Sequence, residues 1–270
     1  MSTERIPTAV DAVAEKWVDT LCEIDPDVRI WLGRDGDVSG FADLSPAGAE
    51  RHRDAVARTL AELTAAEPVD DIDRVTKMDL TRELELSLEL HDAKWDLRDL
   101  NNIASPAQGI RDIFDLMPTD IHENWDTIAH KLANLPEALR GYRESLAKGI
   151  SEGIVPARRQ VVEVITQAQR NAGPDGFFVD FATNTAPADL PESTRKFLHT
   201  AAESARNAYL EFARFLENEL APVALEHDGV GRELHQLHSR HFIGATIDLD
   251  DTYEWGLEEL RRMVDEQEAI

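Results

Sequence analysis

Apolar residues recur three and four positions apart along almost the whole chain, whereas strict alternation of apolar and polar residues is scarce. The spacing matches the period of an α-helix, roughly 3.6 residues, and not the two-residue period of a β-strand. We therefore expect an all-α protein, built as a multi-helix array of about ten helices.

Four sites carry residues that commonly begin a helix. A Ser before a Pro supplies an N-cap and a proline at the first helical position, and an acid pair three residues apart has the spacing of a capping box. These signals lie at Ser45-Pro46, at Ser105-Pro106, at Asp120 with Glu123, and at Asp189 with Glu192. Each predicts the start of a helix, and the last of these helices is expected to end near Leu220.

Further apolar stripes predict helices over residues 7–22, 136–152 and 156–171, and one long helix within residues 70–97. The apolar face of the long helix is broad, which indicates packing on more than one side. Residues 25–43 are rich in Gly and Asp and are expected to form a loop.

Residues 173–187 form a second expected loop, with Phe177, Phe178 and Phe181 close together. Aromatic residues in a loop most often fill a core, and the alternative is that they line a binding cleft. We interpret this segment as a plug of the core.

The helical pattern that begins near Asp250 continues to Ile270 without a glycine, a proline or another stop signal. We interpret residues 1–270 as a single helical domain, a fragment truncated within its last helix. The alternative is a last turn that packs against a partner. A truncated helix leaves apolar side chains uncovered, so we expect self-association through the C-terminal helix.

The charge balance narrows the function. The chain has 53 Asp and Glu against 28 Lys and Arg, a formal net charge of −25. A phosphate backbone or an anionic membrane surface needs a basic patch, so neither nucleic acid nor membrane is an expected partner. The single cysteine, Cys22, cannot form an intramolecular disulfide, and Met1–Arg5 shows no basic start of a signal peptide. The sequence therefore predicts a cytoplasmic protein.

Three local patterns resemble parts of metal sites. His122 and Glu123 begin an H-E-x-x-H pattern, but its fifth position is Asp126, and His130 lies roughly 12 Å along the helix axis from His122, too far to share one ion with it. We interpret this segment as a capped surface helix.

The second pattern is the set His235, His238 and His241, in which successive members are helical neighbours. A pair of this kind can chelate zinc or copper if other ligands join it, and the alternative is a polar helix face. The third pattern, Asp35 to Gly40, resembles the first half of a calcium loop, but Pro46 stands where the bidentate Glu is required. We expect a glycine-rich turn there, and no metal site in the chain.

Several longer segments carry a family resemblance. They are Asn101-Asn102-Ile103-Ala104-Ser105-Pro106, Phe114-Asp115-Leu116-Met117-Pro118, Arg158-Arg159-Gln160-Val161, and the run from Gly231 to Leu260 that contains Gly244-Ala245-Thr246-Ile247-Asp248 and Tyr253-Glu254-Trp255-Gly256. Together they resemble the bacterial "domain of unknown function 885" family. The resemblance implies a helical zinc metallopeptidase fold, with an H-E-x-x-H motif in its C-terminal half.

That motif is absent from this sequence, so the resemblance transfers no zinc ligand and no general base to any residue of the chain. It implies that the chain is the N-terminal half, which forms one wall and the floor of a cleft. Zinc is implied for the full-length family member, and no cofactor is expected in this chain, which should be inactive by itself.

The leading hypothesis is therefore the cleft-forming half of a zinc metallopeptidase or related hydrolase, with a small peptide-like substrate. Amide, guanidinium and aromatic groups suit such a substrate, and the candidates are Asn101, Asn102, Arg159, Arg240, Tyr253 and Trp255. The alternative is a non-catalytic helical scaffold that binds a protein through the aromatic stripe of its last helix.

Overall fold

The structure, a computed structural model, describes residues 5–270, so Met1–Glu4 and the prediction made for them lie outside it. The described residues form eleven α-helices, short 3-10 and π turns, and no strand, which confirms the all-α prediction. The chain divides into two compact units, one that ends at Gly229 and one that spans Val230–Ile270. The prediction of a single, truncated domain stays a prediction.

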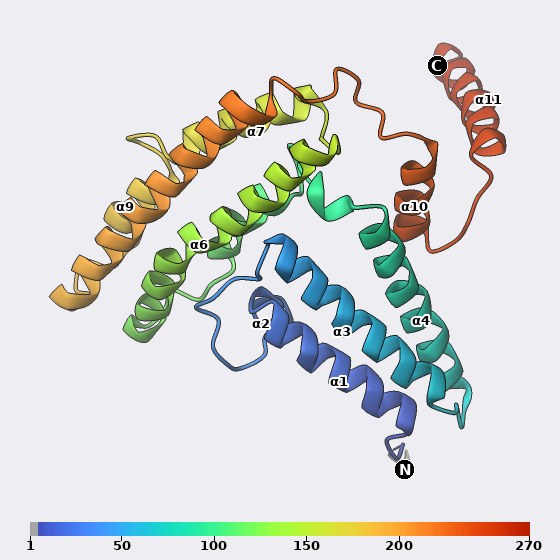
Figure 1. The fold of residues 1–270 in the computed structure, drawn as a ribbon, viewed down its shortest axis with the longest axis horizontal. Helices are drawn as coiled ribbons and strands as arrows, with labels where there is room; N and C mark the ends of the chain where they lie inside the picture. Colours follow the sequence, from blue (N-terminus) through green and yellow to red (C-terminus); the bar gives the residue numbers. More distant parts are fainter. Residues whose placement is uncertain (1–4) are drawn as a thin grey trace. The chain divides into compact units, whose positions relative to one another are not determined.

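Three helices of the first unit share a small core. Helices α1 (Ala9–Ile24), α3 (Pro46–Ala65) and α4 (Asp71–Asp92) pack against one another (Figure 1). Their buried apolar residues come together between them: Val10, Val56, Leu63, Ala66 and Leu84.

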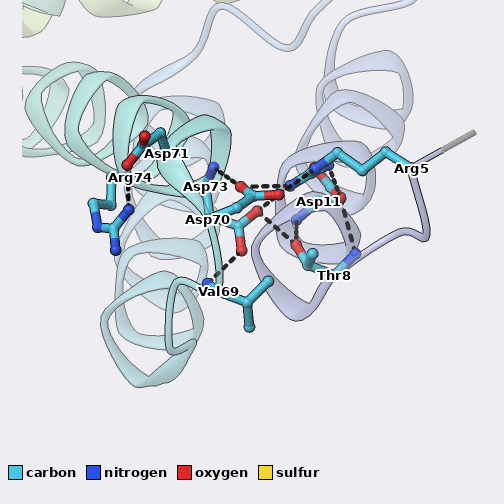
Figure 2. A network of polar contacts seen from close by, with 8 residues as sticks. All are labelled: Arg5, Thr8, Asp11, Val69, Asp70, Asp71, Asp73 and Arg74. Atoms are coloured by element: carbon cyan, nitrogen blue, oxygen red, sulfur yellow. Dashed lines mark hydrogen bonds and ion pairs between the residues drawn. The ribbon is translucent and has the colours of Figure 1, made fainter. Parts of the chain in front are cut away.

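A polar network joins the start of α1 to the start of α4 (Figure 2). The Asp73 carboxylate is fully buried, and it accepts hydrogen bonds from Thr8 Oγ1 at 2.8 Å and from the backbone N–H of Val69 at 2.9 Å. The Arg5 guanidinium pairs with Asp73, Asp70 and Asp11. The network gives the buried Asp73 carboxylate hydrogen-bond and ion-pair partners, and it fixes the start of α1 against the start of α4.

A larger core lies between α6 (His122–Glu152) and α9 (Glu192–Phe215), which run side by side, with α7 (Arg158–Asn171) against α9 (Figure 1). The segment at 173–187 folds into α8 (Phe177–Asp180) and a π turn (Phe181–Thr185) and not into an open loop. Its Phe178 and Phe181 are buried in this core, as predicted for a core plug.

Helix α6 corrects one prediction, because it is a single 31-residue helix with Pro136 inside it. The sequence suggested one helix from Asp120 and a second from Pro136. The buried positions Ile128, Leu132, Leu135 and Leu139 continue across the proline, and packing of this stripe outweighs the one hydrogen bond that a proline removes.

The helix-start signals succeed in part. The Ser45 hydroxyl accepts from the N–H of Gly48 at 3.2 Å, and helix α5 (Pro106–Asp112) begins at the second Ser-Pro pair. The two acidic capping boxes are wrong, since α6 and α9 begin after Ile121 and Pro191 with no side-chain cap.

Two elements within predicted segments were missed. Residues 25–43 contain a short helix, α2 (Asp27–Leu32), which ends at Gly33 in the left-handed conformation. The long helix predicted within 70–97 stops at Asp92, because Lys94 has a positive φ of 57°, and a 3-10 turn, η1 (Trp95–Leu97), follows.

The second unit contains α10 (Arg232–Ile243) and α11 (Leu249–Glu268). Helix α11 matches the predicted C-terminal helix and has no buried residue. No helix among residues 5–270 has the length and apolar character needed to cross a membrane.

Candidate functional site

The candidate site is a cleft in the first unit, where two adjoining cavities of about 430 and 260 Å³ share a wall. Segments far apart in the sequence form it: the end of α1 with α2, the stretch before α3, and the stretch from η1 into α5. Five residues line both cavities: Asp25, Ala42, Leu44, Asp99 and Pro106. The volume suits a small organic molecule or a few residues of peptide.

The walls of the larger cavity are mostly apolar. Trp31 of α2 lines it with 60% of its surface exposed, and Phe41, Leu44 and Ile110 line it as well. Asp25 follows the last residue of α1 in an extended conformation, and Pro26 stands directly before the first residue of α2, Asp27. The short helix α2 contributes the exposed indole of Trp31 to the wall of the cavity.

Asp99 is the carboxyl group with the most altered acidity in the cleft. Burial, and after it the charge of Asp96, raise its pKa to about 7, against a hydrogen bond from Trp95 that lowers it. The buried Tyr142 of α6 holds this segment in place, since its hydroxyl donates to the backbone oxygen of Asp99 at 2.5 Å. A carboxyl group with this pKa can both give and take a proton near neutral pH.

Asp25 is a second carboxyl group in both cavities. Burial raises its pKa, while the N–H of Asp27, which donates to Asp25 Oδ1 at 3.0 Å, and the charge of Lys131 lower it. His52, on α3, lines the smaller cavity, and burial lowers its pKa. The cleft therefore combines acids that resist ionisation with an imidazole that resists protonation.

A buried lysine pairs with Asp27, one of the carboxyl groups that line the larger cavity. Lys131 of α6 has no exposed surface, and its Nζ donates to Asp27 Oδ1 at 2.5 Å and to the backbone oxygens of Val38 and Gly40 at 3.0 and 2.6 Å. Burial lowers the pKa of Lys131 and raises that of Asp27, and each charge offsets the effect on the other. The Nζ also lies 4.1 Å from the ring centroid of Phe41.

This contact explains the calcium-like pattern. The loop directs the backbone oxygens of Val38 and Gly40 at one point, as a cation site would, and the ammonium of Lys131 takes that position. A glycine-rich turn was predicted here because Pro46 stands where a calcium loop needs a Glu. The structure shows this turn closed around the ammonium of Lys131.

The predicted substrate residues of the first unit have structural partners. Asn101 Oδ1 accepts from the N–H groups of Ile103 and Ala104 at 2.8 and 2.7 Å, and the N–H of Asn102 donates to Gln160 Oε1 at 3.0 Å. These bonds shape the loop that leads into α5. Arg159 is exposed and pairs with Asp228.

The other predicted residues lie in the second unit. Arg240 is on α10, and Tyr253 and Trp255 are on α11 with 68% and 64% of their surfaces exposed. The substrate role of all six residues stays a prediction.

The structure places the second histidine pattern on one helix. His235, His238 and His241 lie on α10, and burial lowers the pKa of His238. Within residues 5–270, no three side chains of His, Cys, Asp or Glu are arranged to hold one metal ion.

The near match to H-E-x-x-H has other contacts. His122 lies 3.4 Å from the carboxylate of Asp189, and Asp126 Oδ1 accepts from Thr194 Oγ1 at 2.7 Å. His130 Nδ1 is 2.7 Å from the backbone oxygen of Asp126. The first two contacts join α6 to the segment around the start of α9, and the third lies within α6.

Sequence reasoning missed Asp25, Trp31, Phe41 and Asp99. Each is an isolated residue in an acidic, helical chain, and no local motif surrounds it. The one available signal was the interruption of the long helix before the Asn101-Asn102 turn, which indicates that the chain changes direction near Asp99.

Comparison with known proteins places the chain among bacterial sequences. A family model described as "Bacterial protein of unknown function (DUF885)" matches residues 26–270. No curated protein matches the chain.

Two solved structures have a similar fold. One is described as a "putative lipoprotein" from Colwellia psychrerythraea, with a TM-score of 0.74, 14% identity, and coverage of 95% of this chain and 50% of that chain. The other, a "putative lipoprotein of unknown function" from Shewanella oneidensis, has a TM-score of 0.73, 14% identity, and coverage of 95% and 46%. The chain spans about half the length of these structures.

Proposed function

The chain belongs to the DUF885 family of bacterial proteins, and from this premise we propose that it forms the substrate cleft of a hydrolase of the zinc-peptidase type. The observation that carries the proposal is the cleft itself, in which Asp99 has a pKa of about 7 beside apolar walls. Such a carboxyl group can donate a proton to a leaving group or hold a polar substrate atom in place.

The metal would lie outside this chain. The sequence has no H-E-x-x-H motif, and residues 5–270 hold no group of three suitable ligands. The two similar structures are about twice as long, which supports a second half that supplies zinc and the activated water. On this proposal the chain binds substrate and is inactive by itself.

The location of the protein is a separate question. The cytoplasmic location predicted from the sequence rests on the missing signal-peptide pattern. The descriptions of both similar structures as "putative lipoprotein" point away from the cytoplasm for those proteins. For this protein, cell fractionation that compares its amount in the cytoplasmic and membrane fractions tests the predicted location.

The proposal is tested by measuring zinc content and peptidase activity in two proteins, this chain and the product of its uninterrupted reading frame. We expect stoichiometric zinc and peptide hydrolysis only in a longer product that carries the H-E-x-x-H motif. In that product, Asp99→Asn should lower kcat/KM, while Asp175→Asn, on an exposed loop, should not. A longer product without zinc and without hydrolytic activity would overturn the proposal.

One observation favours a second function, a scaffold that binds proteins. Helix α11 exposes a set of large apolar side chains, a pattern typical of interaction surfaces: Tyr253, Trp255, Leu257, Leu260, Met263 and Val264. Self-association through α11 is expected both of a scaffold and of a truncated helix, so the reading frame separates the two functions. A stop codon directly after Ile270 favours the scaffold, and a downstream H-E-x-x-H motif in the same frame favours the hydrolase.

A further inference from the structure

We propose that the cleft binds organic molecules that carry a protonated amine on an apolar body. The inference rests on the proposed function in that it names the ligand class of the same cleft. It can nevertheless be tested on this chain alone, without zinc and without catalysis.

The first argument is the charge of the larger cavity. Its lining contains four carboxyl groups and no Lys, Arg or His: Asp25, Asp27, Asp99 and Asp112. Two of them already have cationic partners, because Asp27 pairs with Lys131 at 2.5 Å and Asp112 with Arg111 at 3.1 Å. Within residues 5–270, no cationic side chain lies within ion-pair distance of Asp25 or Asp99. A cationic ligand in the cavity would therefore supply the ion-pair partner that these two carboxyl groups lack.

The second argument is the chemistry of the walls. Trp31 and Phe41 are electron-rich aromatic rings, and a cation placed over such a ring is attracted to its face. Apolar side chains, among them Leu44 and Ile110, line the rest of the cavity. Such walls favour an aromatic or aliphatic body over a hydrated inorganic cation.

A metal ion is the competing ligand for a group of carboxylates. It needs several oxygen or nitrogen ligands that converge on one point, and no three such side chains among residues 5–270 have this arrangement. The apolar lining would also leave most of a metal's coordination shell unfilled. An amine needs only one or two carboxylates, which the cleft provides.

The binding should depend on pH, because the carboxyl groups must be ionised to pair with the amine. Asp99 has a pKa of about 7 in the empty cleft. The other titratable groups that line the two cavities with it are Asp25, Asp27, Asp43, His52, Asp96, Asp112 and Tyr142. A bound ammonium should lower the pKa of Asp99, so the ligand should release a proton when it binds near neutral pH.

The test is calorimetric titration of this chain with three indole compounds that differ in charge: tryptamine, N-acetyltryptamine and indole-3-acetate. At about pH 8 we expect tryptamine to bind at least tenfold more tightly than either other compound, a difference of about 1.4 kcal/mol. At about pH 5.5 the affinity for tryptamine should fall severalfold. Titration near pH 7 in buffers of different ionisation enthalpy should show the released proton.

Variants separate the carboxyl groups from the apolar walls. Asp99→Asn and Asp25→Asn should each weaken tryptamine binding severalfold and leave N-acetyltryptamine unaffected, whereas Trp31→Ala should weaken both. Asp175→Asn, on an exposed loop outside the cleft, is the matched control. Circular dichroism verifies that each variant folds.

The outcomes are distinct from those of the enzyme test. Equal binding of the charged and acetylated compounds, no binding of tryptamine, or wild-type affinity in Asp99→Asn would each overturn the amine site. Tryptamine binding in a protein whose longer form has neither zinc nor activity would leave the amine site standing and remove the hydrolase.

Discussion

Several ionisable side chains in or beside the cleft are buried, although burial disfavours their charged forms. Lys131 and Asp27 are both buried, and each is tolerated because the other is present. Among residues 5–270, Asp99 and Asp25 form no ion pair, and burial raises the pKa of both, although the more distant charge of Lys131 offsets part of the effect on Asp25. Groups kept in this state at a cost in stability are characteristic of functional sites.

Loss of the Lys131 ammonium should expose the cost of the Asp27 charge. We expect Lys131→Met to lower the free energy of unfolding by roughly 3–5 kcal/mol, because it leaves a buried carboxylate without a partner. The double variant Lys131→Met/Asp27→Asn should recover part of this loss, as measured by urea denaturation near pH 7. If the double variant is no more stable than the single one, the two residues are not energetically coupled.

Asp99 should make stability depend on pH in a defined direction. Its pKa is raised from 3.8 to about 7 on folding, so the folded state binds the proton more tightly than the unfolded state. The contribution is therefore fully present below about pH 4 and is lost as the pH rises through about 7. Relative to Asp99→Asn, the wild-type chain should lose on the order of 2–4 kcal/mol over this range.

Urea denaturation at several pH values measures this difference, and Asp175→Asn serves as the control for a carboxyl group on the surface. A difference between wild type and Asp99→Asn that does not change with pH would contradict the raised pKa. The direction matters for function, because the same titration controls whether Asp99 can pair with a cation.

At the scale of the elements, local signals were correct where the backbone alone decides. Both Ser-Pro pairs begin helices, since a proline preset at the first helical position needs no distant partner. The acidic capping boxes failed because their side chains have other partners: Asp120 accepts from Asn124, and Asp189 lies beside His122. The prediction that a new helix starts at Pro136 was wrong, because the effect of a proline within a helix depends on the packing around that helix.

Gly149 of α6 shows how closely two elements approach. A Cβ atom added there would lie 2.3 Å from the backbone oxygen of Leu97 and 2.5 Å from that of Ile154. We expect Gly149→Ala to destabilise the protein by about 1–3 kcal/mol, although alanine favours a helix. Gly109→Ala in α5 is the matched control, because an added Cβ meets no atom within 4 Å, and it should be neutral or stabilising in thermal denaturation.

A normal melting temperature for Gly149→Ala would mean that η1 can move away from α6 at little cost. The same contact holds the chain just before Asp99, so a loss of stability there should also weaken the cleft.

At the scale of the whole molecule, the class of fold was predictable and the site was not. Helical periodicity is a property of each stretch of sequence, and it gave α1, α3, α7 and α11 nearly as observed. The cleft needs segments around residues 25–45 and 96–112 to meet against α6, and no local pattern encodes such a meeting. The family resemblance supplied the idea of a cleft, but it could not place Asp99 or Trp31 in it.

The lysine in the loop also implies an order of events during folding. The ammonium of Lys131 is separated in sequence from Asp27, Val38 and Gly40 by 104, 93 and 91 residues. When the chain emerges from the ribosome, the oxygens of this loop have no ammonium partner until the first third of α6 has been made, and contacts that close so long a segment form late. The ligand-binding region therefore matures only after the first part of α6 has been synthesised, and until then its acidic loop stays open to solvent.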